Sequence, residues 1–404
     1  MKDRLKKSLL LLTYGIATML FIGTACQKEM LNEQNIEDNG AIQVENEEVV
    51  LDILAVGDIM THGPQLSAHY HKATDSYDFK DNYRHVRDII KSADIALCNI
   101  ETTFAGEKKG YSSYPRFNTP DTLVDALLYS GFNIGVTANN HSMDTGKEGF
   151  LRTLELLRYR RLPALGTHFD DERNYRIIQK SGVKIGLASF TYETEEYNNK
   201  KTINGIIIPK ELEDNINIFH YGKLEEGFED MKQIIAAMEE SDVDLIIFYI
   251  HWGNEYHKKQ NRYQEQIASY LAEEGVDIIF GSHPHVVQPI EIITNSKNEE
   301  TVVFYSLGNF ISNQRFELTE DRHTEDGIIG KVVYTLELET GVGRIQEVKA
   351  IPTWVNRYYT PAGYQYSILP LPISEELELN QEEFWRANNS YSNTIEIIGS
   401  EYID

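Results

Sequence analysis

Residues 244–285, DLIIFYIHWGNEYHKKQNRYQEQIASYLAEEGVDIIFGSHPH, contain two apolar runs that are each followed by histidine. Residues 244–250 and 276–280 have the length and apolar character of buried strands, and residues 263–274 between them are typical of a helix. A strand, a helix and a second strand in this order are the repeating unit of α/β proteins. This stretch therefore predicts an α/β fold.

The same alternation extends in both directions along the chain. Further strands are expected at residues 49–56, 94–99, 133–137, 183–192 and 301–305. Further helices are expected at residues 121–130, 147–160 and 228–240. The last part differs: residues 327–338 and 343–351 predict a hairpin, and residues 352–404 read as Tyr-rich and irregular, with one helix near residues 374–387.

Composition and charge exclude several classes of protein. With 404 residues, the chain is long enough for two to three domains, or for one large α/β domain with an extension. Its 41% hydrophobic and 25% charged residues exclude wholesale disorder and a multispan membrane protein. Its formal net charge of −25 is opposite in sign to that of a duplex nucleic-acid binder, so we expect no nucleic-acid partner.

The N-terminus has the order of a secretory signal. Basic side chains between residues 2 and 7 precede an apolar run at residues 9–23, which small residues and Cys26 follow. The run is too short and too interrupted for a comfortable transmembrane span. Cys26 after small residues is typical of a lipidation site, although plain secretion and a retained anchor are alternatives. We therefore expect a lipoprotein anchored in the membrane at the extracytoplasmic face of the cell envelope.

These patterns divide the chain into four segments. We expect a signal peptide at residues 1–25, a polar and acidic tether at 26–49, the α/β domain at 50–318, and a C-terminal hairpin and extension at 319–404. Without residues 1–25 the net charge is near −28, and Cys98 is left as the single cysteine beside the lipidated one. A disulfide framework is therefore excluded.

Side chains that can bind a metal follow five of the predicted strands. They are Asp58, Asn99, Glu101, Asn139, Asn140, His141, His251, His283 and His285. In open α/β sheets, chemistry collects beyond the carboxyl ends of the strands. Carboxylates, amide oxygens and imidazoles together suit Zn, Mn or Fe, and two ions about 3.5–4 Å apart can hold both the attacking and the leaving oxygen of a displacement. The sequence therefore predicts a site with one or two divalent metal ions.

Each of these motifs also has a structural interpretation as a turn, a helix cap or a hydrogen-bonded loop. His283-Pro284-His285 is the most informative, because residues i and i+2 of an extended segment point to the same side and Pro284 stiffens the spacing. His62, four residues past Asp58, is a further candidate. Because these motifs occur together at successive strand ends, we expect them to form a functional site.

Six motifs in order along residues 51–315 closely resemble those of the CapA family of poly-γ-glutamate capsule synthesis proteins. They are Gly57-Asp58-Ile59-Met60, Asn99-Ile100-Glu101, Ala138-Asn139-Asn140-His141-Ser142-Met143-Asp144-Thr145-Gly146, His251-Trp252-Gly253-Asn254-Glu255, Gly281-Ser282-His283-Pro284-His285-Val286 and Ser306-Leu307-Gly308-Asn309-Phe310. The family in turn resembles the calcineurin-like metallophosphatases. The resemblance implies a four-layer sandwich, with two central mixed β-sheets flanked by helices, and a C-terminal extension.

The resemblance also implies a role for individual residues. Asp58 would ligate a first metal, and Asn140 and His251 would ligate a second. His283 and His285 would complete the second and the first set of ligands, respectively. The other residues of these motifs that remain candidates are Asn99, Asn139, Glu255 and Asn309.

By the same resemblance, His141 would be the acid or base that protonates a leaving group or stabilises the transition state. Two departures from the metallophosphatase pattern matter. Met60 stands where an Asp-x-His pattern has its histidine, and Glu101, beside Asn99, replaces the usual bridging aspartate. These departures leave open one metal ion in place of two, and a substrate other than a phosphate.

Three functions fit this sequence. The first is a CapA-type protein in capsule or cell-envelope polymer biosynthesis, which would activate water against a phosphoester or amide bond. The second is a metal-dependent phosphoesterase, and the third is a non-catalytic module that binds a polymer or a capsule synthase complex. An acidic polymer would be repelled by the net charge unless metal ions or a local basic patch offset it. Candidates for such a patch are Lys108, Lys109, Arg116, Lys200 and Lys201.

Overall fold

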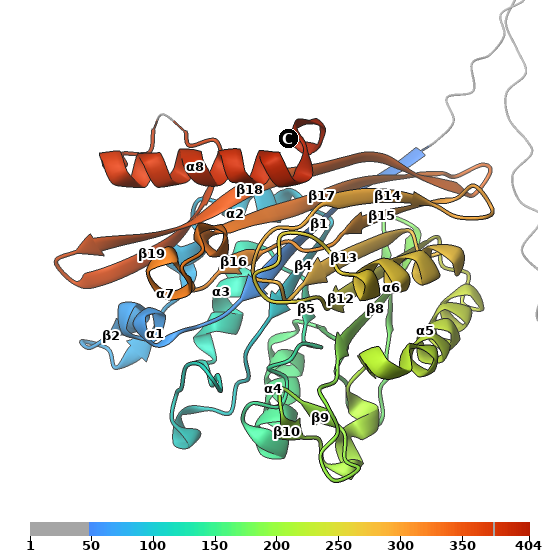
Figure 1. Ribbon diagram of the computed structural model, residues 1–404, viewed down its shortest axis with the longest axis horizontal. Coiled ribbons are helices and arrows are strands. Elements are labelled where there is room, and N and C mark those ends of the chain that lie inside the picture. The colour runs from blue at the N-terminus through green and yellow to red at the C-terminus, as the bar shows by residue number, and fades with distance from the viewer. Residues whose placement is uncertain (1–47, 375) are drawn as a thin grey trace, which may run out of the picture. The chain divides into compact units, whose positions relative to one another are not determined.

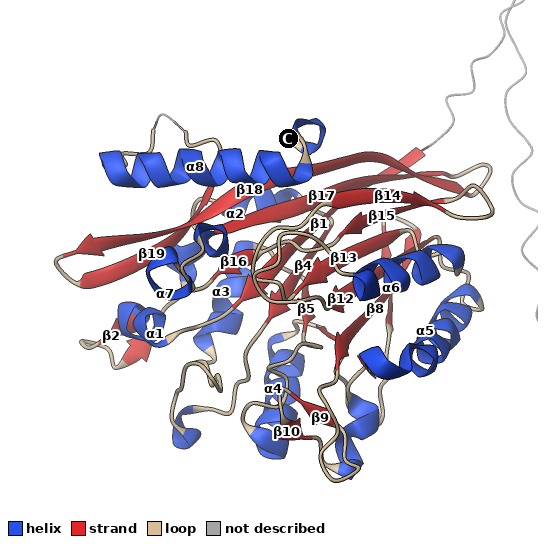
Figure 2. Cartoon of the chain, viewed as in Figure 1, coloured by secondary structure: helices blue, strands red, loops and turns tan. Residues whose placement is uncertain are grey.

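The computed structural model describes residues 48–404 except residue 375. The predicted signal peptide, the predicted lipid attachment at Cys26 and the predicted tether up to residue 47 lie outside the described residues. Two large β-sheets with helices around them make up this part of the chain (Figures 1 and 2). Among the helices of residues 48–404, none combines the length and the apolar character needed to cross a bilayer.

The first sheet has the strand order β19-β18-β17-β1-β4-β5-β6, with β16 beside the end of β1. Its strands are β1 (Glu48–Ile59), β4 (Ile95–Ile100), β5 (Ile134–Val136), β6 (Ala164–Leu165), β16 (Asn309–Ile311), β17 (Asp326–Glu337), β18 (Val342–Thr360) and β19 (Gly363–Pro370). The strands β1, β4, β5 and β6 are parallel to one another, whereas β17, β18 and β19 are antiparallel to their neighbours. The sheet is therefore mixed.

The second sheet has the order β11-β8-β12-β13-β15-β14, with β7 also paired to β8. Its strands are β7 (Arg176–Lys180), β8 (Val183–Tyr192), β11 (Ile218–Phe219), β12 (Leu245–His251), β13 (Ile278–Ser282), β14 (Ile290–Thr294) and β15 (Glu300–Phe304). Only β7 and β14 run antiparallel to their neighbours. Two short pairs stand apart: β2 (Tyr70–His71) with β3 (Ser76–Tyr77), and β9 (Thr202–Ile203) with β10 (Ile206–Ile207).

Eight α-helices surround the sheets within the described residues. They are α1 (Gly63–His69), α2 (Arg87–Ser92), α3 (Thr122–Ser130), α4 (Gly146–Arg160), α5 (Leu224–Glu239), α6 (Arg262–Glu273), α7 (Phe316–Thr319) and α8 (Gln381–Ile398). Short 3-10 helices are η1 (Lys80–Tyr83), η2 (Glu107–Lys109), η3 (Lys210–Asn215), η4 (Tyr221–Lys223), η5 (Arg322–Glu325) and η6 (Ser400–Tyr402).

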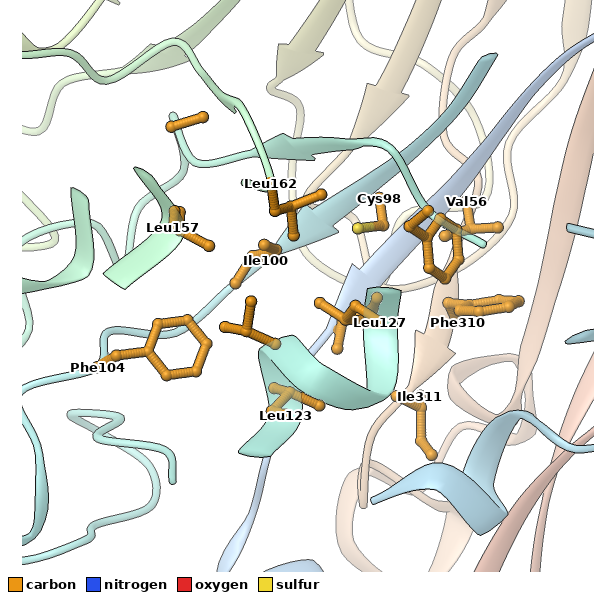
Figure 3. Packing of buried hydrophobic residues seen from close by; sticks show 14 of the residues in the cluster. Val56, Cys98, Ile100, Phe104, Leu123, Leu127, Leu157, Leu162, Phe310 and Ile311 are labelled. Carbon is orange, nitrogen blue, oxygen red and sulfur yellow. The ribbon is translucent and has the colours of Figure 1, made fainter. Parts of the chain in front are cut away.

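The hydrophobic core forms three layers of side chains, which define four layers of structure. Alternate residues of β1 point to opposite sides: Leu51 and Ile53 pack against the second sheet, while Leu54 and Val56 pack toward α3 and α4. Figure 3 shows the outer layer, where Leu127 of α3 lies over the first sheet. Helices α5 and α6 cover the outer face of the second sheet in the same way. The predicted four-layer sandwich of two mixed sheets flanked by helices is thus confirmed.

The C-terminal region is more regular than its sequence predicts. The expected hairpin is present as β17 and β18, and β17 lies directly beside β1 in the first sheet. The prediction that residues 352–404 are irregular is wrong, because β18 continues to Thr360, and β19 and α8 follow. Both faces of β18 are covered there: Val355 packs in the outer layer, and Trp354 packs with Ala387 of α8. A strand buried on both faces lacks the alternation by which strands are found.

The prediction of a helix near residues 374–387 is wrong in its bounds, since α8 begins at Gln381 and continues to Ile398. Asn380 caps it by accepting hydrogen bonds from the backbone N–H of Glu382 and of Glu383, and the Glu383 side chain returns to the Asn380 backbone. This capping box, Asn-x-x-Glu, is visible in the sequence and marks the true start of the helix.

Candidate metal centre

The metal-capable residues at the strand ends lie together, because β1, β4 and β5 end at the same edge as β12 and β13 of the second sheet. They are all at most 4% exposed: Asp58, Asn99, Glu101, Asn139, Asn140, His141, His251, His283 and His285. Carboxylates and imidazoles are rarely buried without partners. The atoms they leave without partners therefore show where a ligand is held.

Glu101 is the centre of this arrangement. Its Oε1 is buried and accepts no hydrogen bond. The Nε2 atoms of three histidines surround that oxygen, at 3.8 Å for His251, 3.9 Å for His285 and 4.0 Å for His141. Burial and the neighbouring carboxylate of Asp58 raise the pKa of Glu101 well above its usual value. A buried carboxylate oxygen that faces three imidazole nitrogens at these distances fits a bound cation, which would hold the carboxylate ionised.

Two groups of ligand atoms share Glu101. One consists of Glu101, His283 and His285, and the other of Asp58, Glu101 and His251, and within each group the ligand atoms lie within 4.8 Å of one another. Nδ1 of His283 is buried without a hydrogen-bond partner. Burial and the neighbouring His285 lower the pKa of His283 to about 3, so its imidazole is neutral at pH 7 and can bind a cation without losing a proton. This donor set of carboxylates and neutral imidazoles suits Mn, Zn or Fe.

Asp58 and His285 orient each other. Burial works against ionisation of Asp58, but its hydrogen bonds with His285 and Asn99 outweigh burial and lower the pKa of the carboxyl. Oδ2 of Asp58 lies 2.9 Å from Nδ1 of His285, and Oδ1 accepts a hydrogen bond of 2.8 Å from Nδ2 of Asn99. Because Nδ1 of His285 is engaged in this way, its Nε2 is left to face Glu101.

Three amide side chains serve to position the ligands. Nδ2 of Asn139 donates to Oδ1 of Asn99 at 3.1 Å, which turns the Asn99 amide nitrogen toward Asp58. Oδ1 of Asn309 lies 3.2 Å from Nδ1 of His285. The amide groups of these three residues are occupied by protein neighbours, so they act on the ligands rather than as ligands.

Asn140 differs from these amides. Its Oδ1 lies 3.1 Å from Nε2 of His251, the same nitrogen that faces Glu101. Nδ1 of His251 is held by Oγ of Ser282 at 2.9 Å, and burial lowers the pKa of His251 well below its usual value. Asn140 and His251 therefore present an oxygen and a neutral nitrogen toward one point, as a shared metal ion requires.

His141 has the geometry of an acid or base. Its Nδ1 lies 2.7 Å from Oδ2 of Asp144, and its Nε2 faces Glu101. Phe117 packs edge-on against the imidazole with ring centroids 4.8 Å apart, and its backbone N–H donates to the same Asp144 oxygen at 2.6 Å. A carboxylate on Nδ1 fixes the tautomer and the ring orientation, which leaves Nε2 for proton transfer.

Two further candidates lie outside the ligand groups. His62 caps α1, and its Nδ1 accepts a hydrogen bond of 3.2 Å from the backbone N–H of Asn313. Burial lowers the pKa of His62 to about 4, so its imidazole is neutral as well. Glu255 is exposed, and it acts on Glu101 and His285 only through its charge. Met60, at the position of the missing histidine, is buried among the core residues.

The backbone conformation of His283-Pro284-His285 differs from the predicted one, although both histidines still face the site. The expectation of an extended segment is wrong: β13 ends at Ser282, and φ is +100° at His283 and +58° at His285. Positive φ is costly for residues with a side chain and persists where surrounding structure enforces it. Here Asp58 supplies part of that structure, since its Oδ2 accepts hydrogen bonds from the His283 backbone and from the His285 ring.

The end of β1 is held by a close backbone contact. The Asp58 N–H donates to the carbonyl of Gly308 at 3.0 Å, and a Cβ on Gly57 would collide with that same carbonyl. Gly308 itself has φ of +69°, a conformation that glycine adopts at least cost. Glycine at both positions therefore allows Asp58 to be placed by the backbone rather than by its own rotamer alone.

Tyr192, Asp144 and Ser282 take part in the site and were not among the predicted site residues. Tyr192 is the last residue of β8, and its ring centroid lies 4.9 Å from that of His283 and 6.4 Å from that of His251. Its position at a strand end was the available signal, but a tyrosine there is equally typical of core packing. Asp144 was signalled by its i+3 spacing from His141, which lies in the same loop.

Comparison with known proteins shows that most of the chain matches a described family. Residues 52–314 match the family model described as "Bacterial capsule synthesis protein PGA_cap". The capsule biosynthesis protein CapA of Bacillus anthracis is 28% identical over 285 residues, which cover 69% of this chain and 63% of that protein. The PGA biosynthesis protein CapA of Bacillus subtilis (strain 168) is 28% identical over 278 residues, which cover 67% of this chain and 66% of that protein.

The chain thus spans slightly less than two thirds of the length of these curated relatives. Among solved structures, one described as a novel phosphatase from Mycoplasma pneumoniae aligns with a TM-score of 0.42 and 14% sequence identity. That alignment covers 76% of this chain and 94% of the phosphatase.

Proposed function

Since the chain belongs to the bacterial capsule synthesis protein PGA_cap family, we propose that it acts as a metal-dependent hydrolase in the production of a capsule or cell-envelope polymer, poly-γ-glutamate in particular. Membership confirms the CapA resemblance of the motifs. The relatives are named for capsule and PGA biosynthesis, and the proposal carries that role to this chain.

One observation carries the metal-dependent part. Oε1 of Glu101 is buried, has no hydrogen-bond partner, and lies 3.8–4.0 Å from the Nε2 atoms of His141, His251 and His285. Without a cation, this arrangement leaves a desolvated carboxylate or a proton that no neighbour accepts, and either costs free energy. The residues therefore fit one or two divalent ions, held by Asp58, Glu101, Asn140, His251, His283 and His285.

The chain's own residues supply the rest of the reaction. When bound, a divalent metal supplies Lewis-acid activation of water at neutral pH. Asp144 holds Nδ1 of His141, so that Nε2 of His141 can give a proton to a leaving group on the side of Glu101. Tyr192 packs against the imidazole of His283, with ring centroids 4.9 Å apart. The bond attacked would be an amide or a phosphoester of the polymer or of its precursors.

Metal content tests this function most directly. We expect one or two equivalents of Mn, Zn or Fe in the purified protein after incubation with these ions. Glu101→Gln, and the pair His283→Ala with His285→Ala, should lose the metal, whereas His71→Ala on exposed β2 should keep it. A wild-type protein that takes up no metal would overturn the hydrolase and leave the non-catalytic polymer- or synthase-binding module.

A second candidate is a phosphoesterase that acts on envelope substrates. The observation in its favour is that both ligand groups share Glu101, so that these residues would hold two divalent ions, which would supply Lewis-acid activation for the displacement at a phosphoester. Hydrolysis of a generic aryl phosphate, lost in His141→Ala, would support it. Two equivalents of metal without such hydrolysis would favour the amide of the polymer.

The location of the protein is part of the proposal. A lipid on Cys26 would anchor the chain at the extracytoplasmic face of the cell envelope, where its partners would be the membrane, the acidic polymer and a capsule synthase complex. Each buried methylene of such a lipid contributes about 0.8 kcal/mol to anchoring. Cys26→Ser should release the protein from membranes and change its electrophoretic mobility, and an unchanged distribution would refute the anchor.

A further inference from the structure

A cavity of about 500 Å³ lies outside the metal centre, in the segment that follows β8. The loop at residues 196–201 forms one wall, and residues 207–213, from β10 into η3, form the other. None of the metal-centre residues lines it. A volume of this size accommodates a ligand as large as a small organic molecule.

The charges of this cavity are unusual for so acidic a protein. Lys200, Lys201 and Lys210 line it together with Glu196 and Glu213, so the wall carries one more positive than negative charge, in a chain of net charge −25. The sequence singled out Lys200 and Lys201 as candidates for a basic patch, together with Lys108, Lys109 and Arg116. The structure separates these candidates, because Lys200 and Lys201 line this cavity and the other three do not.

The carboxylates of the wall are already engaged. Glu213 pairs with Lys210 at 2.7 Å, and Glu196 pairs with Lys223 at 2.7 Å. Within residues 48–404 as described, the ammonium groups of Lys200 and Lys201 make no ion pair.

Two acids outside the wall lie near Lys201. Its charge acts against burial on the pKa of Glu193 and of Asp230, but neither carboxylate is within ion-pair distance. The cavity therefore offers a ligand the ammonium groups of two consecutive lysines, neither of which is held by an ion pair.

Part of the wall formed by residues 207–213 is apolar. Ile207 is 38% exposed, and Ile208 and Pro209 complete this side of the cavity. An aliphatic spacer can pack on it while anionic groups reach the ammonium groups. A chain of carboxylates separated by methylene groups has this chemistry. A compact inorganic anion would use the charges and leave the apolar side bare.

We propose that this cavity binds a carboxylate-bearing segment of the acidic polymer and holds the polymer beside the metal centre. The identity of the polymer rests on the proposed function, whereas the binding of an anionic aliphatic chain rests on the cavity alone. Attraction between exposed charges is screened over about 8 Å at physiological ionic strength, so the binding is salt-dependent.

Two links join the cavity to the metal centre: a short stretch of chain and an ion pair. Tyr192, which packs on His283, is four residues from Glu196, so their Cα atoms are at most about 14 Å apart. Lys147, near the start of α4 and six residues past His141, pairs with Glu211 of η3 at 2.7 Å. A polymer held in the cavity is thereby kept at a high effective concentration near the metal centre.

Binding of a γ-linked glutamate decamer to the full chain tests the proposal by isothermal titration calorimetry at low and at physiological ionic strength. Lys200→Glu with Lys201→Glu should weaken binding at low salt by about tenfold or more, because two attractive contacts become repulsive. The matched control is Lys108→Glu with Lys109→Glu on exposed η2, which makes the same change in net charge and should bind the decamer within about twofold of wild type.

Two measurements separate this proposal from the proposed function. Decamer binding should persist in the variant with His283→Ala and His285→Ala, and metal content should be unchanged in the lysine variant. Lysine-dependent binding by a protein that holds no metal would support the cavity and refute the hydrolase. Equal affinity of the lysine variant and the control would overturn the cavity, and so would inorganic phosphate that displaces the decamer at equal concentration.

Discussion

The metal centre and the lysine cavity hold charge in opposite ways. Glu101 is fully buried, and the ligands around it are fixed by buried amides and by a carboxylate. In the cavity, the Lys210 side chain is 87% exposed, and its partner Glu213 lies only three residues along the chain. One region leaves unpartnered acceptors that converge inside the protein, and the other leaves unpaired ammonium groups at the surface.

This difference indicates which ligand each region is built for. Buried ligands in a fixed geometry select a small cation, because any misplacement leaves a desolvated polar group. Exposed lysines on a loop adapt to a flexible anion at modest gain per contact, since solvent screens each charge. Substitutions at the metal centre should therefore have large effects that depend on geometry, and substitutions at the cavity should have small effects that depend on salt.

The largest effect is expected for His141→Ala. Its Nε2 points toward Glu101 while Asp144 holds its Nδ1, so its loss should lower kcat by a factor of about 10²–10⁴ and leave the metal bound. Steady-state kinetics on the γ-linked polymer and on an aryl phosphate, with metal analysis of the same preparation, would measure this. Full activity in His141→Ala would show that the centre does not use this histidine for proton transfer.

The next effect concerns a residue that positions a ligand without binding the metal. Asn99→Ala removes the hydrogen bond to Oδ1 of Asp58 and should weaken metal affinity by about 10- to 100-fold. Competition with a fluorescent chelator would measure the affinity. The same substitution at exposed Asn388 on α8 should leave the affinity unchanged. If both variants bind metal alike, the amides are not needed to organise the centre.

The convergence of the candidate ligands was predictable because of a simple geometric rule. Parallel strands have their carboxyl ends at the same edge of the sheet. Residues that directly follow the apolar runs therefore lie close together, independently of the conformation of the connecting loops. Asp58, Glu101 and His251 are cases of this kind. The conformation of His283 and His285 was not predictable, since their positive φ depends on hydrogen bonds to Asp58, more than 200 residues away in sequence.

Tyr192 and the C-terminal strands were missed for a related reason. An aromatic residue at a strand end has the same pattern whether it packs in a core or against ligand histidines. Helix α8 covers one face of β18, and the outer core layer covers the other. The sequence of β18 therefore lacks the alternation of apolar and polar residues that reveals a strand. In both cases the deciding contact is made by an element distant in sequence, and the local pattern carries no trace of it.

A pH titration sharpens the contrast on the side of the buried groups, because burial keeps the imidazole of His62 neutral in the folded protein. Its pKa is lowered to about 4 in the folded protein, from about 6.5 when unfolded. Between pH 6.5 and 4 the unfolded state binds a proton at this position and the folded state does not, so acidification favours unfolding by up to about 1.4 kcal/mol per pH unit.

His62→Asn retains a side-chain acceptor at the start of α1 and removes this titration. Chelated wild-type protein should therefore lose stability faster than chelated His62→Asn as the pH falls from 6.5 to 4, and the two should run parallel above pH 7. Urea unfolding at a series of pH values would measure the difference. Parallel curves throughout would mean that His62 takes up its proton without unfolding.

The smallest effect is expected for the ion pair that joins the cavity segment to α4. Lys147 and Glu211 lie 2.7 Å apart, but their side chains are 47% and 58% exposed. Solvent screening and the entropy of two long side chains cancel most of the attraction, so Lys147→Ala should change the unfolding equilibrium constant by less than about fivefold. Lys108→Ala, which removes an exposed lysine of η2, is the control. A large loss of stability confined to Lys147→Ala would contradict the difference drawn between the buried metal centre and the exposed cavity. It would show that the cavity segment is fixed to α4 as firmly as the metal ligands are fixed to one another.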